Sequence, residues 1–276
     1  MDLGLNCRTF KAAGYIEALL CLLTALFMQL FANFANDYSD GIKGSDEGRA
    51  GPETQERGPV RLLASGMASK KELLSACFVC GALCTACGIA ACFVARDFWF
   101  LLVGLACFLA GWFYVGGKRP YGYMALGEIS VLIFFGFVDT MGSGYLIAQS
   151  SFLHFDAASF AILSIVFGLS SVAILALNNF RDRDEDKRHG KITLAVWLGS
   201  SYAFFLPIFL FFSLLAFSFL LGYYRIPWLV APYAFCDLFL IFFSCQALAK
   251  RRWKKGMRLL SSRLVFVCLF LALALA

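Results

Sequence analysis

Stretches of about 20 mostly apolar residues recur along the whole chain, which is the length that an α-helix needs to cross a bilayer. We identify eight of them, at residues 17–36, 72–95, 98–116, 126–148, 157–180, 201–222, 226–249 and 260–276. Of the 276 residues, 61% are hydrophobic and only 15% are charged, against roughly 25% charged residues in a soluble domain. One soluble core cannot bury this much apolar surface. We therefore predict a single polytopic, all-α membrane domain that covers residues 1–276.

The connections between these stretches alternate in charge. Twenty of the 24 lysines and arginines lie in four of them, at residues 37–71, 117–125, 181–197 and 250–263. By the positive-inside rule these four connections face the cytoplasm, as expected of a multi-pass protein of the cell inner membrane. The net charge of +6 reflects this topology. Because the basic residues are spread over four loops with acids among them, we expect no nucleic-acid partner.

The cysteines do not predict a disulfide framework, although there are 11 of them. Four, at 77, 80, 84 and 87, have a spacing similar to that of iron–sulfur ligands. Their neighbours are Phe, Val, Ala and Leu, which offer no polar groups to stabilise a charged cluster. We expect these cysteines to pack as small apolar side chains.

A first group of polar residues ends the stretch at 17–36. Asn33, Asn36, Asp37 and Asp40 are spaced so that they share one face of a helix that continues beyond the membrane boundary. Asp46 follows after a glycine that allows the chain to turn back.

A second group follows the stretch at 157–180. Asn178, Asp182 and Asp186 are each four residues apart, so they also share a helix face, and Asn179 lies beside the first of them. Asp184 lies off that face. Both groups lie at the cytoplasmic border.

Carboxylates gathered on one helix face repel each other and need a cation. Mg²⁺ prefers oxygen ligands and is usually held by one or two carboxylates together with substrate phosphates. A single group of acidic residues at the end of an apolar stretch would indicate only a solvated loop. Two groups, each preceded by asparagines that are costly to place near hydrocarbon, instead predict two walls of a diphosphate–Mg²⁺ site.

The sequences NDYSDGIKGSD (36–46) and NNFRDRDEDKRHGKITLAVWLG (178–199) closely resemble the two signature motifs of the UbiA superfamily of intramembrane prenyltransferases. More narrowly, they resemble the branch that prenylates 1,4-dihydroxy-2-naphthoate in menaquinone synthesis. GGKRPYGYMALGEISVLIFFGF (116–137) is similar to a third stretch of that branch. The likeness runs from about residue 17 to the end of the chain.

The resemblance implies a helix bundle with a central cavity open to lipid, and Mg²⁺-dependent transfer of a polyprenyl group from its diphosphate to an aromatic ring, here giving demethylmenaquinol. The expected partners are polyprenyl diphosphate, the dihydroxynaphthoate acceptor and the lipid bilayer. The candidate catalytic residues are Asp37, Asp40, Asp182, Asp186, Lys118 and Tyr114. The candidate metal ligands are Asp37, Asp40, Asp46, Asp182 and Asp186. The candidate substrate-binding residues are Asn36, Asn178, Asn179, Arg61, Arg181 and Glu128.

The family normally has nine helices, and its first helix has no counterpart before residue 17, so we expect eight spans here. Other aromatic acceptors, an isomeric dihydroxynaphthoate or 4-hydroxybenzoate, stay open. A membrane transporter is the alternative from another class, but transport predicts polar groups at mid-bilayer depth and often inverted repeats.

Glu128 could also simply favour a helix N-terminus. Asp237, near the outer end of its apolar stretch, is expected to snorkel to the interface, and Arg263 is assigned to the last basic connection.

Overall fold

The computed structural model describes residues 12–43, 61–151, 153–223 and 226–275. These residues are almost entirely helical, and the only β-type contact among them is an isolated bridge between Met124 and Ile192. In chain order the elements are α1 (Ala12–Lys43), α2 (Lys70–Ala95), α3 (Phe100–Val115), η4 (Tyr121–Tyr123), α4 (Gly127–Val131), the π-helical η5 (Leu132–Val138), α5 (Asp139–Ser151), α6 (Ala157–Arg188), α7 (Leu194–Leu198), η6 (Gly199–Phe204), α8 (Phe205–Tyr223), η7 (Pro227–Leu229), α9 (Val230–Ala249) and α10 (Trp253–Leu275).

Each apolar stretch expected from the sequence lies on one of these helices or on a continuous run of them. Among the described residues, five helical runs are long and apolar enough to cross a membrane, and a bent pair made of α7–η6 and α8 would add a sixth. Helix α3 is shorter, at 16 residues. The all-α membrane fold is therefore confirmed, and the chain is a multi-pass membrane protein. The number of eight spans stays a prediction.

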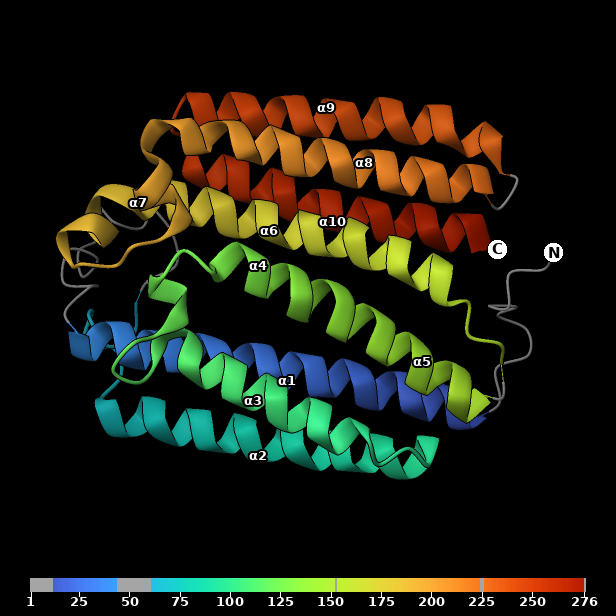
Figure 1. The fold of residues 1–276 in the computed structure, drawn as a ribbon, viewed down its shortest axis with the longest axis horizontal. Helices are drawn as coiled ribbons and strands as arrows, with labels where there is room; N and C mark the ends of the chain where they lie inside the picture. Colours follow the sequence, from blue (N-terminus) through green and yellow to red (C-terminus); the bar gives the residue numbers. More distant parts are fainter. Residues whose placement is uncertain (1–11, 44–60, 152, 224–225, 276) are drawn as a thin grey trace.

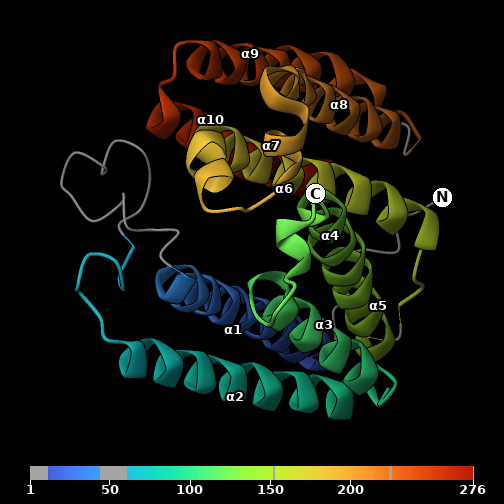
Figure 2. The ribbon, with the colours of Figure 1, turned by 60° about the vertical axis from the view of Figure 1, so that its left-hand side comes forward.

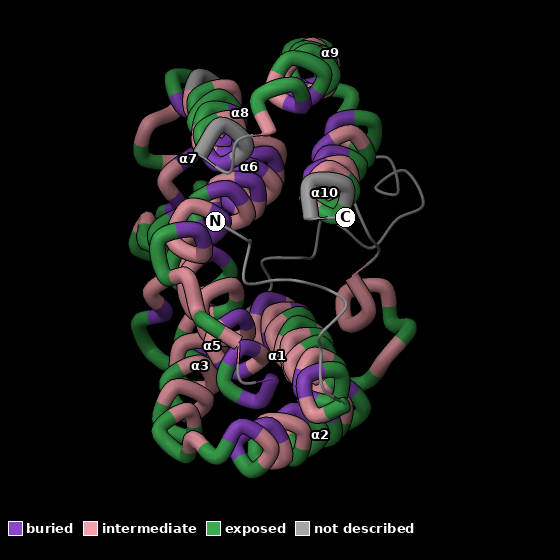
Figure 3. Tube along the Cα trace, turned by 90° about the vertical axis from the view of Figure 1, so that its right-hand side faces the viewer, coloured by how far each residue is buried: buried purple, intermediate pink, exposed green. Residues whose placement is uncertain are grey.

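The helices form two groups that lie side by side (Figures 1 and 2). One contains α1, α2, α3 and the α4–η5–α5 run, and the other contains α6, α8, α9 and α10. Helix α6 is the central element. Half of its most apolar stretch is buried, whereas only 11% of the corresponding stretch of α1 is buried. Many residues of the outer helices are exposed, as the green segments of Figure 3 show. They include many large apolar side chains, and Phe78 and Phe235 are more than 70% exposed. Such surfaces suit contact with lipid rather than water.

The two groups meet closely where η5 crosses α6. A Cβ atom on Gly136 would lie 2.7 Å from the Ser164 carbonyl oxygen and 3.0 Å from the Gly168 Cα atom. Only glycine permits this approach, which is typical of helix crossings in membranes. Stretches of π-helix often occur at functional sites, and η5 begins four residues after Glu128.

The described parts of the four basic connections lie at the same end of the bundle (Figure 1). Helices α1, α3, α6 and α9 end there, and α2, α4, α7 and α10 begin there. This arrangement is the one that the charge pattern predicts. The assignment of this end to the cytoplasm stays a prediction.

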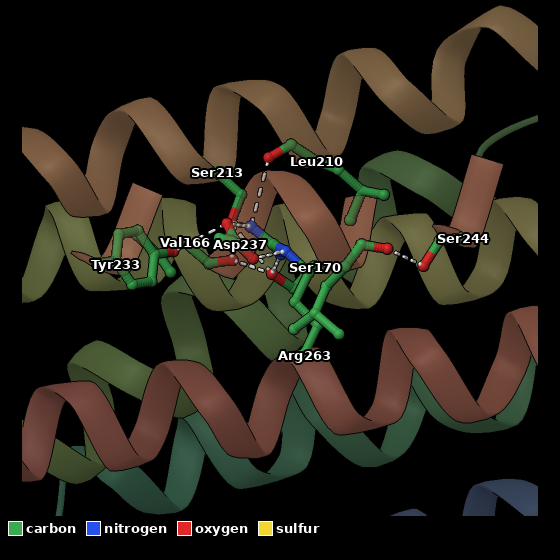
Figure 4. Close-up of polar contacts among 9 residues, drawn as sticks. Val166, Ser170, Leu210, Ser213, Tyr233, Asp237, Ser244 and Arg263 are labelled. Atoms are coloured by element: carbon green, nitrogen blue, oxygen red, sulfur yellow. Dashed lines mark hydrogen bonds and ion pairs between the residues drawn. The ribbon is translucent and has the colours of Figure 1, made fainter. Parts of the chain in front are cut away.

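Two expectations about single charged residues were wrong. Asp237 and Arg263 are both fully buried, and Arg263 lies inside α10 rather than in a loop. Arg263 Nε donates to Asp237 Oδ1 at 2.6 Å, and its Nη1 donates to Ser170 Oγ at 2.7 Å (Figure 4). Asp237 does not snorkel because an opposite charge from the neighbouring helix neutralises it inside the bundle.

Candidate active site

Both acidic motifs lie on helices that extend beyond the apolar stretches. Helix α1 continues to Lys43 and α6 continues to Arg188, which confirms the helical spacing predicted for each motif. Asp37, Asp40 and Asp186 are all at least 93% buried. Carboxylates are rarely this buried without partners, so the contacts of each one define the site.

Lys191 brings the two motifs together. Its Nζ lies 3.6 Å from Asp186 Oδ1 on α6 and 4.0 Å from Asp40 Oδ2 on α1. Tyr123 of η4 donates its hydroxyl proton to Asp40 Oδ1 at 2.5 Å. The Tyr123 ring lies beneath the same ammonium, 5.3 Å from Nζ to the ring centroid, at a distance typical of a cation–π contact. Three segments that are far apart in sequence therefore meet around one cation.

Asp37 binds the backbone of the segment that precedes α2. Its two carboxylate oxygens accept hydrogen bonds from the backbone N–H groups of Leu62, at 2.9 Å, and Leu63, at 3.2 Å. These donors lie directly after Arg61, so Asp37 also fixes the place of that arginine. Asp46 lies outside the described residues.

On α6, Asp182 is paired with its neighbour. Arg181 donates to both Asp182 oxygens, from Nε at 2.7 Å and from Nη2 at 2.8 Å. The two side chains are only 9% and 13% exposed. A bidentate pair of this kind is rigid and strong, and it fixes the position of the Arg181 guanidinium on α6. Asn178, one turn earlier, is half-buried.

Glu128 is the centre of a second polar group, deeper in the bundle. It is 5% exposed. Its Oε1 accepts hydrogen bonds from Asn179 Nδ2 at 2.9 Å and from the Tyr202 hydroxyl, which is closer still. Its Oε2 is buried and has no partner among the described residues. Glu128 therefore does more than favour a helix N-terminus.

Tyr114 lies between the two polar groups. The negative charges of Glu128, Asp40 and Asp186 all act on its hydroxyl. A Cβ atom on Gly122 would lie 2.5 Å from the Tyr114 carbonyl oxygen, so the η4 turn can approach Tyr114 only with glycine there. Tyr121 packs edge-on against Tyr114, with ring centroids 5.4 Å apart, and burial raises the pKa of the Tyr121 phenol.

Lys118 is placed differently from the other candidates. It follows Gly117, which has φ of +80°, in the turn after α3. It is exposed and forms no ion pair with any described residue. Its role at the diphosphate stays a prediction.

The donor set fits Mg²⁺ that enters together with a phosphate. Within the described ranges no three His, Cys, Asp or Glu side chains are close enough to hold a metal ion by themselves. Mg²⁺ does not need such a cage, because it keeps several waters and uses substrate phosphates with one or two carboxylates. Asp40 on α1 and Asp186 on α6 are two buried carboxylates that fit this requirement. Asn36 Oδ1, one residue before Asp37, is buried without a partner in the described part of the chain.

The cysteines pack as expected. Cys77 and Cys80 form a buried apolar cluster with Phe31 and Ala35 where α2 lies along α1. Cys84 donates to the Thr24 carbonyl oxygen at 3.4 Å.

Residues 10–275 match the UbiA prenyltransferase family. The chain belongs to this family. It is similar to the 1,4-dihydroxy-2-naphthoate octaprenyltransferases of Mycobacterium tuberculosis, with 38% identity over 69% of this chain and 61% of the relative, and of Escherichia coli, with 39% identity over 67% and 58%. The chain thus spans about 60% of the length of the curated relatives that it matches.

Solved UbiA structures have the same fold. The apo UbiA homolog from Aeropyrum pernix K1 superposes with a TM-score of 0.65 at 15% identity, covering 96% of each chain. The UbiA homolog from Archaeoglobus fulgidus bound to GPP and Mg²⁺ gives a TM-score of 0.64 at 16% identity, covering 99% of this chain and 91% of that one.

Sequence reasoning missed three residues that contact the candidate site residues. Lys191 and Tyr123 lie inside the conspicuous motifs, so the motifs themselves were the available signal. Tyr202 had no such signal, because it reaches Glu128 only through the bend between α7 and α8.

Proposed function

We propose that this chain is a Mg²⁺-dependent aromatic polyprenyltransferase. It would transfer a polyprenyl group from polyprenyl diphosphate to 1,4-dihydroxy-2-naphthoate and so form demethylmenaquinol. The observation that carries the proposal is the meeting of the two acidic motifs at Lys191, from helices α1 and α6. The similarity to the dihydroxynaphthoate octaprenyltransferases supports the choice of acceptor.

The chemistry requires stabilisation of the diphosphate as it leaves the allylic carbon. Mg²⁺, when bound, supplies Lewis-acid stabilisation of that leaving charge. The residues that would hold it are Asp37, Asp40, Asp46, Asp182 and Asp186. Arg181, fixed by its pair with Asp182, adds positive charge that is already oriented before the reaction. Arg61 and Lys118 are the further cationic candidates.

The deeper polar group would serve the acceptor. Glu128, held by Asn179 and Tyr202, offers a buried carboxylate oxygen to a hydroxyl of the ring. The aromatic face of Tyr114, between Glu128 and the acids, can stabilise the allylic cation. The amides of Asn36 and Asn178 would add neutral oxygen ligands and hydrogen-bond donors.

The remaining helices would provide the apolar environment. Their exposed apolar side chains face the bilayer, and a cavity open to lipid would accommodate a long polyprenyl tail. Exclusion of water protects the cation from hydrolysis. The acidic end of the bundle would lie on the cytoplasmic side of the cell inner membrane, as the basic connections predict.

The test uses membranes that contain the protein, with polyprenyl diphosphate, Mg²⁺ and one aromatic acceptor at a time, and identifies the product by mass. We expect prenylated product from 1,4-dihydroxy-2-naphthoate. Product only from an isomeric dihydroxynaphthoate or from 4-hydroxybenzoate would replace the acceptor and keep the reaction class. Absence of product with every acceptor would refute the proposal and favour transport.

A further inference from the structure

Lys191 is an unusual lysine for a loop of a membrane protein, because three elements hold its side chain. Its ammonium lies between Asp40 of α1 and Asp186 of α6, above the ring of Tyr123. Its side chain is only 17% exposed. Nearby Lys187 is exposed instead, so burial is not a general property of this basic segment.

The backbone around Lys191 is fixed as well. Lys191 N–H donates to the Asp186 carbonyl oxygen at 2.8 Å, which closes the turn after α6. Gly190 has φ of +70°, a conformation that favours glycine. The next residue, Ile192, accepts a hydrogen bond from Ala125 N–H at 2.8 Å. The ammonium is therefore positioned by the fold and does not sample the surface freely.

The ammonium occupies the place that a divalent cation would need in order to join the two motifs. Asp40 Oδ2 and Asp186 Oδ1 lie 4.0 Å and 3.6 Å from Nζ, so one carboxylate from each helix flanks the ammonium. If Mg²⁺ alone entered, the displaced ammonium would remain beside it, and the two cations would repel each other. A diphosphate that enters with the metal removes this penalty, because its oxygens give the ammonium a new partner.

We infer that Lys191 is a tethered cation that neutralises the Asp40–Asp186 pair and then exchanges its carboxylate partners for diphosphate oxygens when metal and substrate bind together. This inference rests on the proposed function and assigns a means of coupling within the same site. Lys191 makes the binding of metal and diphosphate mutually dependent, and such coupling is reciprocal. The protein thus binds Mg²⁺ weakly until a prenyl diphosphate is present, and more tightly afterwards.

The experiment measures metal binding rather than turnover. The full chain in detergent micelles is titrated with Mn²⁺, a paramagnetic substitute for Mg²⁺, and free Mn²⁺ is followed by electron paramagnetic resonance. Each titration is run with and without geranyl thiolodiphosphate, an allylic diphosphate analogue that ionises slowly. The variants are Lys191→Met and Lys191→Gln, which remove the charge, Lys191→Arg, which keeps it, and Lys187→Met as the matched exposed control.

Both neutral variants should bind Mn²⁺ alone roughly tenfold more tightly than the wild-type protein. The gain in Mn²⁺ affinity that the analogue produces should shrink by a similar factor. Lys191→Arg and Lys187→Met should match the wild type in both measurements. Far-UV circular dichroism of each variant shows whether the helices are intact.

The possible failures are distinguishable. If the wild-type protein binds no Mn²⁺ even with the analogue, the proposed function itself fails. If the wild-type protein binds Mn²⁺ with the analogue but neither intact neutral variant gains affinity for Mn²⁺ alone, only the role of Lys191 is refuted. A gain of the same size in Lys187→Met would also refute it, because the effect would then reflect net charge.

Discussion

Removing Asp237 should destabilise the bundle strongly, because it leaves the Arg263 guanidinium buried without its counter-charge. Arg263 is 0% exposed and makes two bonds to Asp237, from Nε at 2.6 Å and from Nη2 at 2.7 Å. Its other bonds go to neutral oxygens of Ser170, Ser213 and Leu210 (Figure 4). Loss of one partner of a buried ion pair costs about 3–5 kcal/mol. We therefore expect a decrease of that size in the free energy of unfolding for Asp237→Ala.

The double variant Asp237→Ala/Arg263→Met separates the cost of an unpaired charge from the value of the pair. Replacement of both partners by apolar groups is often close to neutral, so the double variant should recover most of the lost stability. Methionine fills much of the arginine volume and needs no partner. Asp184→Ala is the control, because Asp184 is 75% exposed in its pair with Arg183, and exposed pairs contribute about 0–1 kcal/mol.

Stability is measured by reversible unfolding in mixed micelles with increasing mole fraction of sodium dodecyl sulfate, followed by circular dichroism. The expected order of stability is Asp184→Ala near wild type, then the double variant, then Asp237→Ala. The reasoning is refuted if Asp237→Ala unfolds together with Asp184→Ala. It is also refuted if the double variant is as unstable as the single one, since packing rather than charge would then determine the loss.

Three further predictions concern the site and the helix crossing. Asp182→Ala should lower turnover by about 10²-fold or more, whereas Asp184→Ala, off the acidic face, should stay within a few-fold of wild type in the same membrane assay. Glu128→Gln should raise KM for the aromatic acceptor roughly tenfold with KM for the diphosphate little changed, and the opposite pattern would place Glu128 on the diphosphate side. Gly136→Ala should cost about 1–3 kcal/mol because its Cβ would meet the α6 backbone at 2.7 Å, while Gly104→Ala, with nothing within 4 Å, should not destabilise in the same unfolding measurement.

The fold and the two motifs were predictable from the sequence because both depend on local periodicity. Apolar stretches mark helices wherever the surrounding solvent is lipid, and acids four residues apart share a helix face in any context. The positions of Asp182 and Asp186 on α6 follow from these rules alone.

The pairings between distant helices were not predictable in this way. Asp237 and Arg263 each look unfavourable when judged on their own helix, and only the packing of α9 against α10 shows that they neutralise each other. The same holds for Lys191, which the charge pattern places among ordinary loop cations. Side-chain partners across helices depend on rotation and depth, which the period of a sequence does not specify.

Among the described residues, the buried polar groups near the acidic motifs differ from the network around Arg263 in how completely their hydrogen bonds are satisfied. Around Arg263, donors and acceptors are matched, and Ser170 and Ser213 also hydrogen-bond to the Val166 carbonyl oxygen. Around the acidic motifs the match is incomplete, because Asn36 Oδ1 and Glu128 Oε2 are buried without partners in the described residues. An unsatisfied buried acceptor costs about 1–3 kcal/mol, which a purely structural network avoids. The end of the bundle that carries the acids therefore retains hydrogen-bonding capacity for a ligand, whereas the network at Arg263 uses its own to hold α6, α8, α9 and α10 together.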